Sequence, residues 1–463
     1  MFAPNLWEKV QVPADSAQTT TAASTGDARS IELQGHHHNA LYLVVAIVMI
    51  FLTLVLALQP LYLSQVLGLA RENAGFVNAN IQVITELVDL LFVGYLGYIS
   101  DRIGRVPLIV YGFLLAGVTA LFAPFDKEIG AMLGLNALVI FYVVRVLMSL
   151  GGTLIWPQVA TLTGDYTRQE DRPLLLANVG FMMAFGVTLV YAVFMQLPEL
   201  IGVTMTMWLA ALFALTGAWL AKTLLVETAQ PKMVDRSFPF REVWQLVKQE
   251  QGLRLSFMSA FTSRNDMVIV GLFLMTWFIY FADLMEKTSH AQAASRAGLV
   301  IGLLGLVVLI SIPVWGRVTK KLGRIPAVAI GLLLSGVGFA SMGLIFNPFS
   351  WWIVLPIIVI GIGQAGCILV PQTLALDLAP EEIRGSVLGV FNTVGCFGVI
   401  FFLQVGGILF DWLGPTTPFI FTGIVNMLLF GYSLVVMNSV KGKRKPSVKN
   451  TRKPVEEFNL SSI

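Results

Sequence analysis

The stretch Gly97-Tyr-Ile-Ser-Asp101-Arg102-Ile-Gly104-Arg105-Val-Pro107 decides the fold, because a degenerate copy of it returns later in the chain. The copy reads Gly316-Arg317-Val-Thr-Lys320-Lys321-Leu-Gly323-Arg324-Ile-Pro326 and aligns with the first without a gap; Gly112 and Gly117 then map onto Gly331 and Gly336. Each copy is predicted to be a short charged loop between two long apolar runs. A chain that repeats its own membrane hairpin is predicted to consist of two similar membrane-embedded halves.

Composition indicates a membrane protein independently of the repeat. Hydrophobic residues make up 56% of the chain and charged residues 12%, about half the charged share of a soluble protein. A spanning helix needs about 20 mostly apolar residues, and runs of this kind occur at 40–63, 77–98, 107–125, 131–158, 174–197, 202–225, 265–285, 296–315, 325–346, 351–376, 385–410 and 415–438. Strands are disfavoured, since the runs are long and do not alternate. The predicted fold is an all-α integral membrane protein, with twelve transmembrane helices in two pseudo-symmetric six-helix bundles.

The positive charges predict the orientation. Most of the 30 basic residues fall in the two tails and in the even-numbered connections, which are cytoplasmic by the positive-inside rule if both termini are inside. The formal charge of +3 therefore reflects topology and indicates no nucleic-acid partner. We expect a multi-pass protein of the cell inner (plasma) membrane with cytoplasmic N- and C-termini. The basic C-terminal tail is read as solvated, with contact to anionic lipid headgroups as the alternative.

Composition shifts divide the chain into five predicted segments. These are a disordered cytoplasmic tail (1–38), an N-terminal six-helix bundle (39–226), a cytoplasmic linker with an amphipathic surface helix (227–261), a C-terminal six-helix bundle (262–438) and a basic cytoplasmic tail (439–463). The two cysteines, Cys367 and Cys396, lie in apolar helices, which excludes a disulfide framework and favours buried inert thiols. The run His36–His38 is either a loose metal-binding group or a polar run at the membrane edge. The second reading is preferred, and neither a metal site nor a cofactor is predicted.

A second internal similarity supports the duplication. Asp165-Tyr-Thr-Arg-Gln-Glu-Asp-Arg172 links the fourth and fifth predicted helices, and Asp377-Leu-Ala-Pro-Glu-Glu-Ile-Arg384 links the tenth and eleventh. Short polar loops can look alike by chance, but two similarities in matching helix order make chance a poor explanation.

The first charged segment resembles the signature loop of the major facilitator superfamily, Gly-x-x-x-Asp-Arg-x-Gly-Arg-(Arg/Lys), with the weaker second copy typical of that family. The sequence departs from the pattern at Val106, and Lys320 replaces the acidic residue in the second copy. The resemblance implies a secondary active transporter that works by alternating access, moves a small-molecule substrate and uses a proton gradient. It also implies a functional monomer embedded in membrane lipids.

The resemblance also implies a cytoplasmic gate. In the family the acidic residue of the loop reaches the start of the eleventh helix, so Asp101 is expected to act as the acceptor, with Arg102 and Arg105 orienting it. The alternative is a loop whose charges only fix orientation. The predicted gate residues are Gly97, Asp101, Arg102, Gly104, Arg105, Gly316, Arg317, Gly323 and Arg324.

Charges inside the apolar runs predict the substrate or proton-coupling site. Glu86 and Asp89 are three residues apart and share a helix face, and Arg145 lies within the fourth run. Each such charge costs about 2.5–3.5 kcal/mol on insertion scales, so it normally faces a partner or an aqueous cavity. One acid is expected to face Arg145 while the other remains protonatable, and a purely structural ion pair is the alternative. Arg264 and Asp266 are predicted to open the seventh helix near the cytoplasmic face, with a helix-end role preferred over a substrate role.

Arg145 favours a small anionic solute as the substrate, and three other functions compete with transport of such a solute. A drug-like exporter is the nearest, although the fifth helix lacks the Gly-Pro-Gly-Gly pattern of the family's drug–proton antiporters. A membrane enzyme is disfavoured, because the sequence has no Gly-x-x-x-x-Gly-Lys-(Ser/Thr), His-Glu-x-x-His or Gly-x-Ser-x-Gly motif. We predict no catalytic residue. The third is a non-transporting sensor or scaffold that kept the transporter fold.

Overall fold

The long apolar runs fold into helices, because in lipid every backbone N–H and C=O must be satisfied within the protein. The computed structural model describes residues 35–166, 172–227, 240–263, 266–285, 288–380 and 383–443. Within these residues, eleven helices are long and apolar enough to cross a membrane, and Val270–Ala282 is a shorter apolar helix. The same residues contain no strand. The predicted all-α membrane fold is confirmed.

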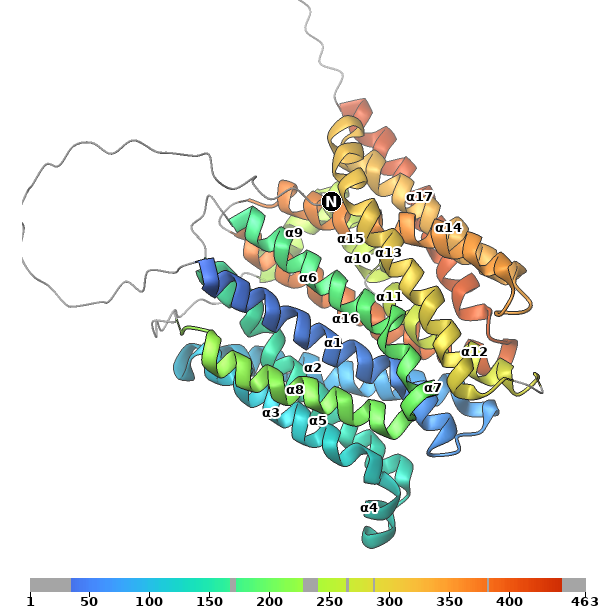
Figure 1. Cartoon of the computed structure of the whole chain (residues 1–463). Coiled ribbons are helices and arrows are strands. Elements are labelled where there is room, and N and C mark those ends of the chain that lie inside the picture. The colour runs from blue at the N-terminus through green and yellow to red at the C-terminus, as the bar shows by residue number, and fades with distance from the viewer. Residues whose placement is uncertain are drawn as a thin grey trace, which may run out of the picture. The chain divides into compact units, whose positions relative to one another are not determined.

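The first six spans lie between residues 35 and 224 (Figure 1). They are α1 (Gly35–Gln65), α2 (Ala74–Ile103), α3 (Arg105–Phe122), α5 (Ala137–Asp165), α6 (Arg172–Ala192) and α8 (Val203–Leu224). Asn136 starts α5 by accepting a hydrogen bond from the Leu138 N–H at 2.8 Å. Short helical pieces lie between the spans: Arg71–Asn73, Ala123–Phe125, α4 (Asp126–Leu133), Phe194–Gln196 and α7 (Leu197–Ile201).

The later spans follow a short helix, α9 (Phe240–Gln249). They comprise α10 (Gln251–Ser263), α11 (Asp266–Ile269), a π-helical turn (Val270–Leu274), α12 (Met275–Ala282), α13 (His290–Leu322), α14 (Arg324–Ser341), α15 (Val354–Leu378), α16 (Arg384–Leu413) and α17 (Thr417–Lys443). Two 3₁₀ turns, Met342–Leu344 and Trp351–Ile353, lie between α14 and α15. A capping box formed by Ser289 and Gln292 starts α13.

The repeat seen in the sequence is repeated in the packing. α3 packs against α5 and α8, and its counterpart α14 packs against α15 and α17. Gly112 of α3 lies against Gly151 of α5, and its sequence equivalent Gly331 lies against Gly366 and Cys367 of α15. Each glycine lacks the Cβ that would meet the neighbouring backbone, so the helices can approach closely.

Two boundaries differ from the prediction. α1 begins at Gly35, inside the segment predicted as a tail, and His38 Nε2 lies 3.0 Å from the Tyr166 carbonyl oxygen. α10 occupies residues predicted as linker, but Leu253, Leu255, Ser256 and Ser259 are fully buried, and α10 packs against α15, α16 and α17. The seventh span therefore starts earlier than its apolar run.

The two signature segments are mostly helical, which corrects their prediction as loops. Gly97 and Asp101 belong to the last turns of α2, and Gly316 and Arg317 belong to α13. Single glycines make the turns: Gly104 has φ +101° and Gly323 has φ +87°. Only glycine adopts this backbone readily, so each motif is a helix end, a one-residue turn and a helix start.

The helices define two ends of the bundle. The near end is the one at which α1 begins and α17 ends, and the far end holds the connections after α1, α3, α6, α12, α14 and α16. Helices of the first six spans contact helices of the last six through α2 with α16 and α6 with α13.

Candidate functional site

Arg145 is the centre of a polar group within the first six spans. Its side chain is buried, with 6% of the residue exposed. Its Nε donates to Gln59 Oε1 of α1 at 3.1 Å, and its Nη2 donates to Gln82 Oε1 of α2 at 3.3 Å. Neutral amides thus hold the guanidinium, and Arg145 takes part in none of the ion pairs between described residues. An acid is nevertheless close enough for its charge to act on Arg145, and that acid is Asp89.

The two acids of α2 connect to this group indirectly. Gln82 Nε2 donates to Glu86 Oε1 at 3.3 Å, so Glu86 reaches Arg145 through Gln82. Asp89 Oδ2 accepts a hydrogen bond from Ser149, one turn beyond Arg145 on α5, at 2.7 Å. The structure therefore brings Glu86, Asp89 and Arg145 into one polar group, bridged by Gln82 and Ser149.

Gln59 is fixed by a further layer of hydrogen bonds. Its Nε2 donates to the Asn78 carbonyl oxygen at 2.9 Å and to Asn78 Oδ1 at 3.2 Å, and both residues are fully buried. Because the amide nitrogen of Gln59 is engaged, its oxygen points at Arg145. Sequence reasoning missed Gln59, Gln82 and Asn78, since neutral amides give no charge signal in an apolar run.

The helix start predicted at Asp266 is not the start of the seventh span. Asp266 is the first residue of α11, but α10, which ends at Ser263, already precedes it, and the π-helical turn Val270–Leu274 follows. Arg264 and the side chain of Asp266 lie outside the described residues. The prediction placed them at a helix start because the apolar run begins there, while the preceding turns of α10 carry buried serines.

Each half carries an ion pair at the near end, and the two pairs correspond. Arg105, which starts α3, pairs with Asp165 at the end of α5. Arg324, which starts α14, pairs with Asp377 near the end of α15, with Nε to Oδ2 at 2.6 Å. Both partners belong to the two sequence similarities. Arg105 thus contacts Asp165, and its expected role in orienting Asp101 stays a prediction.

Other near-end contacts tie the first signature segment to the end of α8. Glu227 Oε2 accepts a hydrogen bond from the Val106 N–H at 2.8 Å, next to Gly104. The Tyr166 hydroxyl donates to the Val226 carbonyl oxygen at 2.9 Å and accepts from the Val226 N–H at 2.8 Å. Burial raises the pKa of the Tyr166 phenol, so the hydroxyl stays protonated and able to donate.

The remaining predicted gate residues are placed only in part. The side chain of Asp101 lies outside the described residues, so its expected contact with the start of α16 stays a prediction. Arg102 is exposed, and so are Gly316 and Arg317 on α13.

The far end holds hydrogen bonds that cross between the first and last six spans. Tyr280 donates to the Leu69 carbonyl oxygen at 2.9 Å, and Ser295 pairs with Gln196. Ser64 lies 3.1 Å from His290 Nδ1, whose Nε2 lies 2.6 Å from Asp283. Asp411 accepts from two N–H groups of α2. The far end is therefore joined by polar contacts from several helices.

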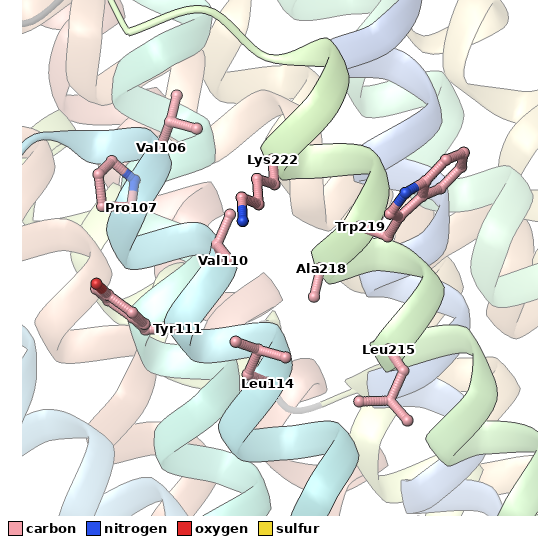
Figure 2. Close-up of a pocket in the computed structure, with 9 residues that line it drawn as sticks. All are labelled: Val106, Pro107, Val110, Tyr111, Leu114, Leu215, Ala218, Trp219 and Lys222. Carbon is pink, nitrogen blue, oxygen red and sulfur yellow. The ribbon is translucent and has the colours of Figure 1, made fainter.

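A groove of about 480 Å³ lies between α3 and α8, away from the Arg145 group (Figure 2). Its wall is mostly apolar, and Tyr111 and Trp219 are 58% and 65% exposed. Its full lining is Val106, Pro107, Val110, Tyr111, Leu114, Leu215, Ala218, Trp219 and Lys222. None of the polar residues of the Arg145 group lines this groove, so it is not our candidate for the solute site.

Several known proteins are similar in sequence to this chain over most of its length. The family model of the Major Facilitator Superfamily matches residues 41–401 and 267–462. The chain is 54% identical to magnetosome protein MamH of Paramagnetospirillum magneticum over 88% of this chain and 94% of that protein. It is 38% identical to magnetosome protein MamZ of Magnetospirillum gryphiswaldense over 90% of this chain and 64% of that protein. The chain thus spans slightly less than two thirds of MamZ.

Solved structures share the fold. The nucleoside transporter NupG superposes with a TM-score of 0.66 at 13% identity, covering 88% of this chain and 100% of that one. A peptide transporter of the POT group superposes with a TM-score of 0.65 at 15% identity, covering 89% and 96%. With the family match over nearly all of its spans, the chain belongs to the Major Facilitator Superfamily.

Proposed function

We propose that this protein is a secondary active transporter that moves a small anionic solute by alternating access and couples its movement to protons. The observation that carries the proposal is the buried guanidinium of Arg145, held by the amide oxygens of Gln59 and Gln82. Amide oxygens orient the guanidinium without cancelling its charge. A buried positive charge in a spanning helix attracts an anion and marks a substrate pathway.

Asp89 is our proposed proton carrier. It lies near the middle of α2, where its carboxylate interacts with the hydroxyls of Ser149 and Thr153. Its Oδ2 accepts the Ser149 hydrogen bond, and its buried Oδ1 makes no hydrogen bond of good geometry with the described residues. That oxygen can take up or release a proton without breaking a bond. Because Ser149 is one helical turn from Arg145, an anion at Arg145 and a proton at Asp89 would influence each other electrostatically.

The contacts between the two sets of spans support a state closed at the far end. Gly407 of α16 lies against Ala79 and Gly75 of α2, and Gly302 of α13 lies against Ala192 of α6, all toward the far end. On the same helices toward the near end, Leu91 is 77% exposed and Phe397 is 51% exposed. With the termini in the cytoplasm, as the basic residues favour, this state opens inward.

We also propose a cellular location. The relatives MamH and MamZ are named as magnetosome proteins, which supports a place in a magnetosome membrane. Density-gradient fractionation of cells that carry a tagged chain tests this. Co-sedimentation with plain inner membrane and absence from magnetosomes would contradict it.

Flux through the purified protein tests the transport proposal. Proteoliposomes with an imposed pH gradient are offered a panel of small inorganic and organic anions, cations and drug-like cations, and uptake is followed with the gradient on and collapsed. We expect gradient-dependent flux of at least one anion. Flux of drug-like cations alone would favour an exporter, and no flux in either orientation would favour a non-transporting scaffold.

A further inference from the structure

We propose that Asp411 is a lock for the far end: its carboxylate caps the first turn of α2 and holds the two sets of spans together there. This inference rests on the proposed alternating access. Asp411 Oδ1 accepts a hydrogen bond from the Gly75 N–H, and Oδ2 accepts one from the Phe76 N–H, both at 2.8 Å. Asp411 is 336 and 335 residues away from these two partners in sequence.

The cap is needed because α2 has none of its own. The first four N–H groups of a helix have no partner within the helix. Asn73, at the N-cap position of α2, makes no capping hydrogen bond with its side chain, and the first turn of α2 contains no acidic residue. The Asp411 carboxylate, which is distant in sequence, therefore supplies the hydrogen-bond acceptors for two of these N–H groups. It also supplies the negative charge that a helix N-terminus favours.

Glycines let the two helix ends approach closely enough for this contact. A Cβ on Gly75 would lie 2.7 Å from Phe410 Cβ and 2.8 Å from Asp411 Oδ1. One turn before Asp411, a Cβ on Gly407 would lie 2.8 Å from Ala79 Cβ. Gly75, Gly407 and the Asp411 carboxylate thus allow α2 and α16 to cross closely. A larger residue at either glycine would force one of the helices to shift.

Opening of the far end must break this contact. When α16 moves away from α2, two N–H groups lose a charged acceptor, and the carboxylate must find water instead. Asp411 therefore biases the equilibrium toward the far-end-closed state. Removing its charge should raise the far-end-open population about ten- to a hundredfold, the range for hydrogen bonds to charged groups.

Cysteine accessibility measures this population without a substrate. Cys367 and Cys396 are replaced by serine, and Ser295→Cys is added as the reporter, because Ser295 is 6% exposed and lies in a far-end contact with Gln196. The labelling rate with a membrane-impermeant maleimide is compared in proteoliposomes. Asp411→Asn is expected to raise the rate at least tenfold, and Asp411→Glu, which keeps the charge, is expected to raise it less.

Glu199→Gln is the matched control, because Glu199 is an exposed carboxylate at the same end, in α7. It should leave the labelling rate unchanged.

If Asp411→Asn does not fold, Gly75→Ala tests the same contact from the α2 side and should raise the labelling rate. Equal labelling of well-folded Asp411→Asn and its parent, or equal acceleration by Glu199→Gln, would overturn the lock. Labelling does not require flux, so the two proposals can fail separately. If Asp411→Asn raises the labelling rate but the protein transports no solute, the proposed function is contradicted and the lock is not.

Discussion

Arg324 pairs with Asp377 at 2.6 Å in the same relation in which Arg105 pairs with Asp165. In each half, the arginine follows the glycine turn of the signature segment and starts a spanning helix, α3 or α14. The aspartate lies at or near the end of the next spanning helix, α5 or α15. The pairs therefore brace the start of one helix against the end of another within each half. Such braces let each half move as a rigid unit, which rocking of the halves requires.

The two braces should differ in their contribution to stability. Arg324 and Asp377 have side chains that are 39% and 51% exposed, whereas Arg105 and Asp165 are 14% and 31% exposed. Asp377→Asn should lower the free energy of unfolding by less than about 1 kcal/mol. Asp165→Asn should lower it by about 1–3 kcal/mol, because it removes the charged acceptor of a more buried guanidinium. Denaturant unfolding in a mild detergent measures both, and equal losses would contradict the difference in burial.

The two glycine turns offer a matched test of the Glu227 contact. Gly104→Ala and Gly323→Ala should each cost about 1–3 kcal/mol for the disfavoured backbone. Only at Gly104 would the new Cβ also meet a neighbour, Glu227 Oε2 at 2.7 Å; at Gly323 nothing lies within 4 Å. Gly104→Ala should therefore be the more damaging of the two in thermal unfolding. The reverse order would show that Glu227 does not hold the turn.

Transport should require a positive charge at position 145, so no neutral residue should replace Arg145 without loss of transport. Arg145→Gln removes the charge but leaves an amide beside Gln59 and Gln82, so we expect uptake of the anionic substrate to fall about 100-fold or more with the protein still inserted. Arg145→Lys keeps the charge but loses the two-armed geometry, and should mainly raise KM. Initial uptake rates in proteoliposomes separate the two. Full uptake by Arg145→Gln would leave Arg145 a structural role only.

Asp89 should set the pH dependence of transport. Asp89→Asn cannot take up a proton, so uptake should lose most of its response to an imposed pH gradient while exchange of substrate across the membrane continues. Ser149→Ala is the control, because it removes the hydrogen bond to Oδ2 and leaves the carboxylate titratable. Identical pH profiles for the parent and Asp89→Asn would exclude coupling at this residue.

Sequence reasoning found the spans because the bilayer imposes a length and a polarity that can be read from one chain. It missed the true start of the seventh span, since Ser256, Ser259 and Thr262 in α10 are buried against other helices rather than lipid. It placed Glu86, Asp89 and Arg145 in one site from charge alone. The linking amides and the contact from Asp411 to Gly75 depend on tertiary structure, and no local pattern in the sequence encodes them.

Reciprocal movement of the two ends is tested most directly by distances between spin labels. Leu200 and Leu284 are exposed at the far end, on opposite sets of spans, and Ile103 and Arg384 are exposed at the near end. Cysteine pairs at these positions are labelled in the parent and in Asp411→Asn, and their distance distributions are measured by double electron–electron resonance. We predict that Asp411→Asn lengthens the Leu200–Leu284 distance and shortens the Ile103–Arg384 distance in the same fraction of molecules. A far-end distance that lengthens while the near-end distance stays fixed would contradict rocking of two rigid halves about a central site.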